Sequence, residues 1–139
     1  MYKTLLRFSI LLLTGAILFA IYMLFYFSKQ SNTITVQPGA YVKILEQVHE
    51  NPDKYIGKKF IISGYVYVQD DFSDNRFVIA QNVYITELSS TEPYVVGFLC
   101  ENRSGIDIYL DENIKIEGIL DKAIYNEDEY PILLVDRIM

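Results

Sequence analysis

Residues 59–69 read KFIISGYVYVQ, and this stretch carries the most regular strand pattern in the chain. Successive side chains of a strand point to opposite sides of a sheet, so alternate residues share a face. One face is apolar and holds a central glycine; it comprises Phe60, Ile62, Gly64, Val66 and Val68. The other face comprises Ile61, Ser63, Tyr65, Tyr67 and Gln69. Because a glycine inside a strand usually marks a bend or a bulge, we predict a bent strand.

The same pattern, with a central glycine at Gly118, recurs at residues 114–121. Further strands are predicted at residues 76–85, 94–101 and 131–138, and residues 106–110 fit either a short strand or a single helical turn. Strands that bend at a central glycine suit a small, strongly coiled barrel. The predicted fold class is therefore mainly β, a small five-stranded OB-like barrel.

A short helix is predicted ahead of the first of these strands, at residues 40–50. Its apolar positions follow an i, i+3, i+4, i+7 spacing that places them on one helix face, and they are Tyr41, Ile44, Leu45 and Val48. The sequence Asn51-Pro52 then ends the helix, because proline disfavours helical backbone in the residue before it.

Residues 8–27, FSILLLTGAILFAIYMLFYF, contain no charged side chain. A helix of this length, at about 1.5 Å per residue, reaches roughly 30 Å, the thickness of the hydrocarbon core of a bilayer. We therefore expect one N-terminal transmembrane helix. Lys3 and Arg7 precede it, so the positive-inside rule predicts a cytoplasmic amino terminus and an extracytoplasmic C-terminal domain. We favour an uncleaved anchor over a cleaved signal peptide, because no small-x-small site follows the run.

The chain is thus expected to comprise a transmembrane anchor at residues 1–28, a linker at 29–39, and a barrel domain with its leading helix at 40–139. The linker is predicted from a polar stretch that closes with Pro-Gly. Residues 28–139 hold ten Lys and Arg against eighteen Asp and Glu, a net charge of −8. Nucleic acid is therefore not an expected partner, because phosphate binding requires a basic face.

Two segments resemble a known family pattern. They are NPDKYIGKKFIISGYVYVQDDFSDNRFVIA at residues 51–80, and VVGFLC at 95–100 followed by ENIKIEGIL at 112–120. They are similar to the OB-like C-terminal domain of a bacterial membrane-protein family of unknown function, whose members are described as permease accessory subunits. The resemblance implies an OB-like fold. The sequence departs from the family pattern in having one span instead of several, and it has residues 85–87 (ITE) in place of a cysteine pair.

Other chemistry-bearing residues lack the neighbours that a reaction or a metal would need. The acidic groups at residues 70–74 and 127–129 lack the spacing of a calcium loop and are expected to be solvated turns. The one cysteine, Cys100, is expected to be a small buried strand residue, and the one histidine, His49, a surface or capping residue. We therefore expect no enzyme activity, no metal and no cofactor.

Tyr65 and Tyr67 are the candidate binding residues, because outward aromatic side chains on an OB-like barrel can stack against a sugar, a base or a partner side chain. The alternative is that they cover the barrel beneath the helix. The favoured hypothesis is a membrane-anchored module, in contact with the lipid bilayer, that binds an integral membrane protein. The second hypothesis is a small-ligand or glycan-binding domain of the cell envelope. The placement of the two tyrosines, under the helix or in an open groove, bears on the choice.

Overall fold

The computed structural model describes residues 14–25, 33–84 and 92–139. The chain divides into two units, Met1–Asn32 and Thr33–Met139, and residues 14–25 of the first are helical. Within the described ranges, no helix combines the length and the apolar character that a membrane crossing requires. The span predicted at residues 8–27 extends past the described helix on both sides, into residues 8–13 and 26–27, which lie outside the described ranges.

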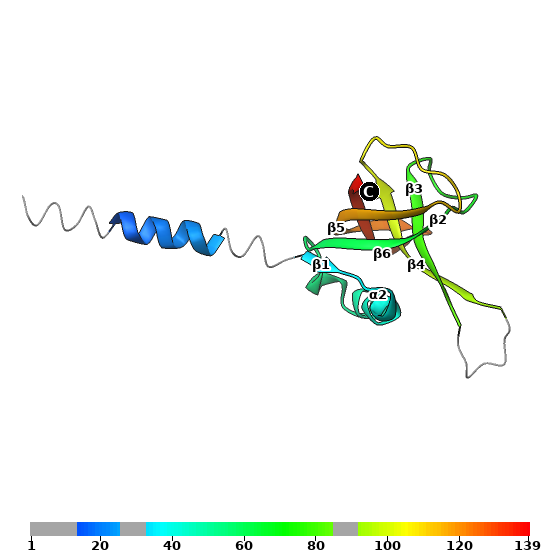
Figure 1. Ribbon diagram of the computed structural model, residues 1–139, viewed down its shortest axis with the longest axis horizontal. Coiled ribbons are helices and arrows are strands. Elements are labelled where there is room, and N and C mark those ends of the chain that lie inside the picture. Colours follow the sequence, from blue (N-terminus) through cyan, green and yellow to red (C-terminus); the bar gives the residue numbers. More distant parts are fainter. Residues whose placement is uncertain (1–13, 26–32, 85–91) are drawn as a thin grey trace, which may run out of the picture. The chain divides into compact units, whose positions relative to one another are not determined.

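The second unit is a barrel in which five strands close into a ring (Figure 1). The strands in chain order are β1 (Thr33–Thr35), β2 (Lys59–Tyr67), β3 (Arg76–Val83), β4 (Tyr94–Asn102), β5 (Asn113–Tyr125) and β6 (Asp128–Ile138). The sheet order is β1-β2-β3-β4-β6-β5, and β5 pairs back with β2 to close the ring. Ring neighbours are antiparallel except β4 and β6, which run parallel. This Greek-key ring is OB-like, so the mainly β class is confirmed.

The strand count differs from the prediction, because the described residues form six strands and not five. The additional strand, β1, lies within the stretch expected to be linker and pairs in parallel with the first residues of β2. Its sequence, Thr-Ile-Thr, is β-branched and suits a strand. Ile34 packs against the core and Val36 is buried. The barrel unit therefore begins at Thr33, since this segment covers an edge of β2 that would otherwise expose unpaired backbone.

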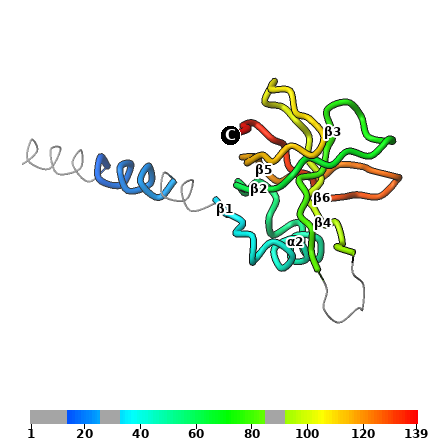
Figure 2. Tube along the Cα trace, turned by 45° about the vertical axis from the view of Figure 1, so that its right-hand side comes forward, coloured from blue at the N-terminus to red at the C-terminus, as the bar shows by residue number. Residues whose placement is uncertain are grey.

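The core fills the inside of the ring with the apolar face of each strand. Its largest fully buried strand side chains are Phe60, Ile62, Phe77, Ile79, Phe98, Ile116, Leu120 and Leu133. One helix, α2 (Tyr41–Glu50), packs over this core through Tyr41 and Val48, as its predicted apolar face requires (Figure 2). The 3₁₀ turns η1 (Pro38–Ala40) and η2 (Pro52–Lys54) flank the helix.

The two glycines predicted to mark bends both lie where strands approach closely. A register shift in the β5–β6 ladder falls between Glu117 and Gly118. A Cβ at Gly118 would lie 2.7 Å from the carbonyl oxygen of Leu134, and one at Gly64 would lie 2.5 Å from that of Ala80. Only glycine avoids these overlaps, so the bends of β2 and β5 depend on it.

The segment at residues 106–110 is neither of the two structures that the sequence left open. It forms an irregular connection between β4 and β5 and ends in a turn at residues 110–111. Ile108 packs against the core, whereas Ile106 and Tyr109 are exposed. The partly buried side chain of Ile108 and hydrogen bonds from Asn102 to the Ile106 carbonyl and from the Tyr109 N–H to Glu112 hold the segment on the barrel without strand pairing.

Candidate functional site

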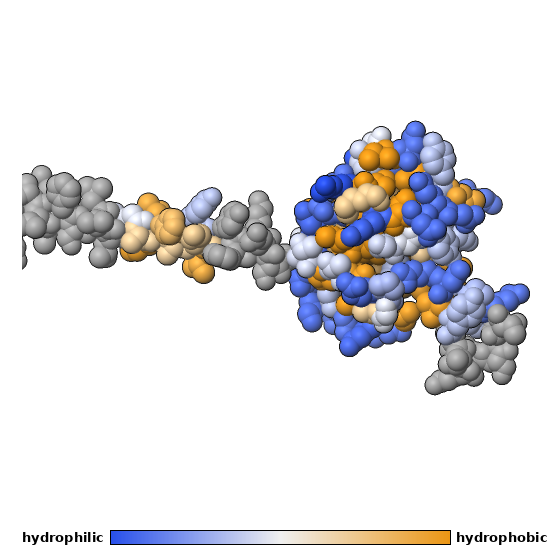
Figure 3. Space-filling view, viewed as in Figure 1, coloured by the Kyte–Doolittle hydropathy of each residue, from blue (hydrophilic) through white to orange (hydrophobic). Residues whose placement is uncertain are grey.

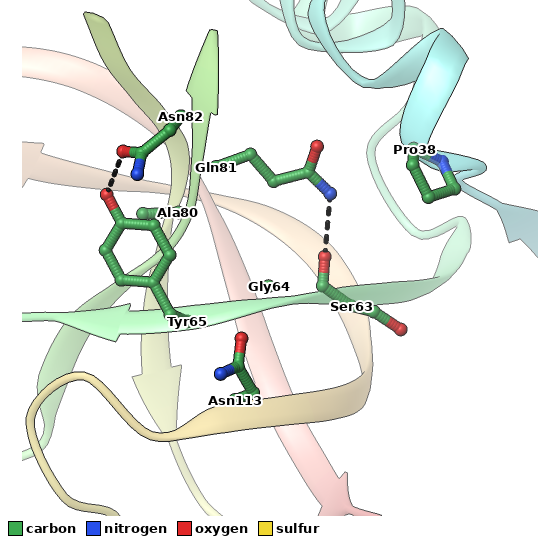
Figure 4. A pocket seen from close by; sticks show the side chains of 8 residues that line it. All are labelled: Pro38, Ser63, Gly64, Tyr65, Ala80, Gln81, Asn82 and Asn113. Atoms are coloured by element: carbon green, nitrogen blue, oxygen red, sulfur yellow. Dashed lines mark hydrogen bonds between the residues drawn. The ribbon is translucent and has the colours of Figure 1, made fainter. Parts of the chain in front are cut away.

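A groove opens where β2 and β3 separate. The two strands pair only through residues 65–67 and 78–80, whereas β3 continues beside β4 as far as the pair Val83 and Tyr94. At the point of separation, the side-chain amide of Gln81 donates a hydrogen bond of 3.1 Å to the backbone carbonyl of Ser63. The groove has a volume of about 380 Å³ and is lined by Pro38, Ser63, Gly64, Tyr65, Ala80, Gln81, Asn82 and Asn113 (Figure 4).

Tyr65 forms one wall of this groove, where β2 has β3 on one side and β5 on the other. Its register partners are Ala80 and Asn113. The phenol is half-buried and donates a hydrogen bond of 2.8 Å to Oδ1 of Asn82. Figure 4 shows the Tyr65 ring standing beside Asn82, with Asn113 on the neighbouring strand. The hydrogen bond fixes the ring orientation, so the site presents a positioned aromatic face.

A second hollow adjoins the first and shares three of its lining residues. It has a volume of about 280 Å³ and is lined by Tyr65, Asn82, Asp111 and Asn113. Burial and the nearby Asp111 carboxylate raise the pKa of the Tyr65 hydroxyl. The phenol therefore remains a neutral hydrogen-bond donor at physiological pH.

The structure separates the two tyrosines that the sequence paired. Tyr65 lies in the open groove, whereas Tyr67 lies two residues further along β2 on the same face, opposite Val78, and lines neither hollow. The buried tyrosine of the helix is Tyr41, whose hydroxyl donates to the backbone carbonyl of Ile79. Tyr65 thus has the open placement that the ligand-binding hypothesis requires.

The amide side chains of the groove were missed in the sequence. Gln81 and Asn82 interrupt a run of β-forming residues in β3, and Asn113 begins β5. A polar pair inside an apolar strand was a detectable signal, but its proximity to Tyr65 depends on the β2–β3 register. No sequence pattern pointed to Asp111. Its place beside Tyr65 depends on a long-range contact, a hydrogen bond of 2.9 Å from its backbone N–H to the carbonyl of Val66.

The two predicted acidic turns approach each other at the end of the barrel. The Tyr125 hydroxyl donates to Asp71 Oδ2 at 2.8 Å and to Gln69 Oε1 at 3.0 Å, and this bond to the carboxylate raises the pKa of Tyr125. The Tyr125 ring packs edge-on against Phe72 and Tyr130. These contacts connect the β2–β3 loop with the β5–β6 hairpin, and no group of metal-binding side chains occurs among the described residues.

Cys100 and His49 both have structural placements. Cys100 is fully buried in β4, and burial raises the pKa of its thiol. A raised pKa disfavours the reactive thiolate. His49 is exposed near the end of α2, and its Nδ1 donates to the Leu45 carbonyl at 2.8 Å. The two predictions, a buried strand residue and a surface residue, are confirmed.

The ring topology and the polar groove define an OB-like β-barrel domain with an open polar groove on its surface. A family model named DUF1980 C-terminal domain matches residues 23–139, and the chain belongs to this family. The predicted resemblance to an uncharacterised bacterial family with an OB-like C-terminal domain agrees with this assignment.

Comparison with curated proteins gave no match. Among solved structures, the chain is similar to the N-terminal domain of PriB protein from Thermoanaerobacter tencongensis, with 17% sequence identity and a TM-score of 0.35. That likeness covers 58% of this chain and 92% of the other.

Proposed function

We propose that this chain is a membrane-anchored, extracytoplasmic binding module without enzyme activity, whose OB-like barrel takes a small polar ligand or a glycan in the groove beside Tyr65. The observation that carries the proposal is the open placement of a hydrogen-bonded tyrosine among three amide side chains, Gln81, Asn82 and Asn113. Aromatic rings offer an apolar face to a ligand, and amides both donate and accept hydrogen bonds. This combination suits hydroxyl-rich ligands.

The charge distribution argues against a nucleic acid in this groove. The described residues that line the two hollows include one carboxylate, Asp111, and no cationic side chain. The net charge of residues 28–139 is −8. Proteins hold single-stranded nucleic acids by base stacking on aromatic rings and by basic side chains that contact the phosphates. The groove has an aromatic ring but no basic side chain among its described lining residues.

The anchor proposal rests on the uncharged run at residues 8–27 and on the positive charges of Lys3 and Arg7 before it. It places the module in the cell membrane as a single-pass protein, with the barrel outside. A surface cysteine tests this. Asp107→Cys adds an exposed thiol, while the native Cys100 is buried and unreactive. We expect a membrane-impermeant maleimide to label the variant in intact cells; labelling only after lysis would contradict the orientation.

The binding proposal is tested by titrating soluble cell-wall fragments into the full chain, solubilised in a detergent without a sugar headgroup. Tyr65→Ala should abolish binding, because it removes both the ring and the hydrogen bond to Asn82. Tyr67→Ala is the matched control, since it changes the same residue type on the same strand face outside both hollows. Equal binding by the two variants would refute the proposed site.

A second candidate function is binding of an integral membrane protein, including a role as accessory subunit of a permease. Three neighbouring apolar side chains favour this candidate. They lie where β3 ends and β4 begins, and all three are exposed: Tyr84 (68%), Tyr94 (42%) and Val95 (50%). Figure 3 shows hydrophilic and apolar residues interspersed over the visible face of the barrel. Neighbouring exposed apolar side chains, such as Tyr84, Tyr94 and Val95, offer a protein partner a contact surface apart from the groove.

This candidate predicts that a Tyr94→Ser and Val95→Ser double variant loses an integral membrane protein that the wild-type chain retains after crosslinking in intact membranes. Tyr109→Ser is the control, because Tyr109 is an aromatic residue in a different part of the chain and is even more exposed (67%) than Tyr94 and Val95. Recovery of the same protein with all three chains would refute a role for the hairpin.

A further inference from the structure

The two adjoining hollows differ in charge. The larger is lined by uncharged side chains and backbone, whereas the smaller contains the carboxylate of Asp111. Tyr65, Asn82 and Asn113 belong to both, so the hollows form one continuous surface with the tyrosine at their junction. A ligand that spans this surface meets hydrogen-bonding groups throughout and a negative charge at one end only.

The Asp111 carboxylate is available to a ligand. The side chain is exposed, and none of the ion pairs found among the described residues involves it. Its backbone N–H donates to the Val66 carbonyl at 2.9 Å, which holds the residue beside β2. Asp111 has a φ of 61°, a left-handed conformation that aspartate and asparagine adopt more readily than most residues.

We propose that the groove binds a chain of amino sugars, with sugar hydroxyls against the amides of the larger hollow and a protonated amine beside Asp111 in the smaller one. This inference rests on the proposed function, because it names the ligand class of the same site. Acidic sugars are disfavoured, since they would approach a carboxylate without a cationic partner in the groove, and residues 28–139 carry a net charge of −8. Neutral sugars satisfy the amides but leave the carboxylate without a counter-charge.

The test compares three tetrasaccharides by titration calorimetry with the full chain, again in a detergent without a sugar headgroup and at mildly acidic pH. They are β-1,4-linked glucosamine, which is cationic; its fully N-acetylated form, which is neutral; and tetragalacturonate, which is acidic. We expect the cationic oligomer to bind about two- to fivefold more tightly than the neutral one, the range of an exposed ion pair. The acidic oligomer should bind most weakly, and added salt should reduce the preference.

Asp111→Asn should remove the preference for the cationic oligomer over the neutral one, because asparagine removes the charge while it keeps the size and the left-handed backbone. Asp107→Asn is the charge-matched control: it removes an exposed carboxylate from the same loop, outside both hollows. It should retain the preference. An equal loss in both variants would show a general effect of net charge and would overturn the assignment of Asp111.

The outcomes separate the two proposals. Binding of the acidic or the neutral oligomer at least as tightly as the cationic one, with loss on Tyr65→Ala, would overturn the amino-sugar inference while supporting the groove as a binding site. Failure of all three oligomers to bind the wild-type chain would overturn this inference, and failure of cell-wall fragments as well would refute the proposed ligand-binding function.

Discussion

Replacing Tyr41 by phenylalanine removes one hydroxyl from a fully buried position of α2 and retains the ring. That hydroxyl donates to the backbone carbonyl of Ile79, immediately before the point where β3 leaves β2. The ring itself packs edge-on against Phe98, with centroids 5.7 Å apart, and this contact survives the substitution. The variant therefore removes the polar contacts of the hydroxyl and retains the aromatic packing between the helix and the barrel.

We expect the Tyr41→Phe variant to be about 1 kcal/mol less stable, because it loses a buried hydrogen bond between the helix and the barrel. Each kcal/mol corresponds to a fall of about 4–8 °C in the melting temperature of a domain near 100 residues. Urea unfolding followed by tyrosine fluorescence measures the change, since the chain contains no tryptophan. Tyr109→Phe, the same change on an exposed ring, should stay within about 0.5 kcal/mol of wild type. Equal stability of the two variants would refute the role given to the Tyr41 hydroxyl.

Three further changes test the packing and charge of the barrel. Gly118→Ala should cost about 1–3 kcal/mol, because its Cβ would lie 2.7 Å from a β6 carbonyl, whereas Gly39→Ala meets open space and should leave the urea midpoint nearly unchanged. Burial raises the pKa of Cys100, so above the unfolded thiol pKa of about 8.5 the thiol loses its proton on unfolding. The free energy of unfolding should therefore fall by about 1.4 kcal/mol for each pH unit above that value. Urea titrations at pH 8 and pH 10 measure this fall, and the Cys100→Ala variant should lack the contribution of the thiol to it. Lys59 forms a 2.7 Å ion pair with Glu117 and lowers the pKa of that carboxyl, so Lys59→Met should cost at most about 1 kcal/mol at pH 7, a difference that disappears as acid protonates Glu117.

The strand pattern of residues 59–69 predicted the side chains of β2 that face the core, but it was wrong for Val68, which lies beyond the end of β2 and is exposed. Phe60, Ile62 and Val66 are buried, and Tyr65 is on the opposite face, as the period of two requires. The helix at Tyr41–Glu50 was equally predictable, because its apolar positions follow helical spacing. These features depend on neighbours in sequence, so a local pattern specifies them.

The extra strand was less predictable. Thr33–Thr35 is too short and too polar to stand out from a linker, and it becomes a strand only because the edge of β2 lies beside it. Residues 106–110 show the converse, since their apolar side chains suggested regular structure that the barrel does not form there. In both segments the available backbone partners, and not local propensity, decided the outcome.

The sequence by itself determined the bent, glycine-containing strands, the covering helix and the net negative charge of residues 28–139. The tertiary structure decided the candidate site. Tyr65 and Tyr67 are equivalent in the strand pattern, but β3 leaves β2 beside only one of them, and the groove forms at that point. Asn82 and Asp111 reach Tyr65 from other parts of the chain through long-range pairing. A pattern within one strand cannot encode where its neighbour diverges, because that position follows from the register and closure of the whole ring.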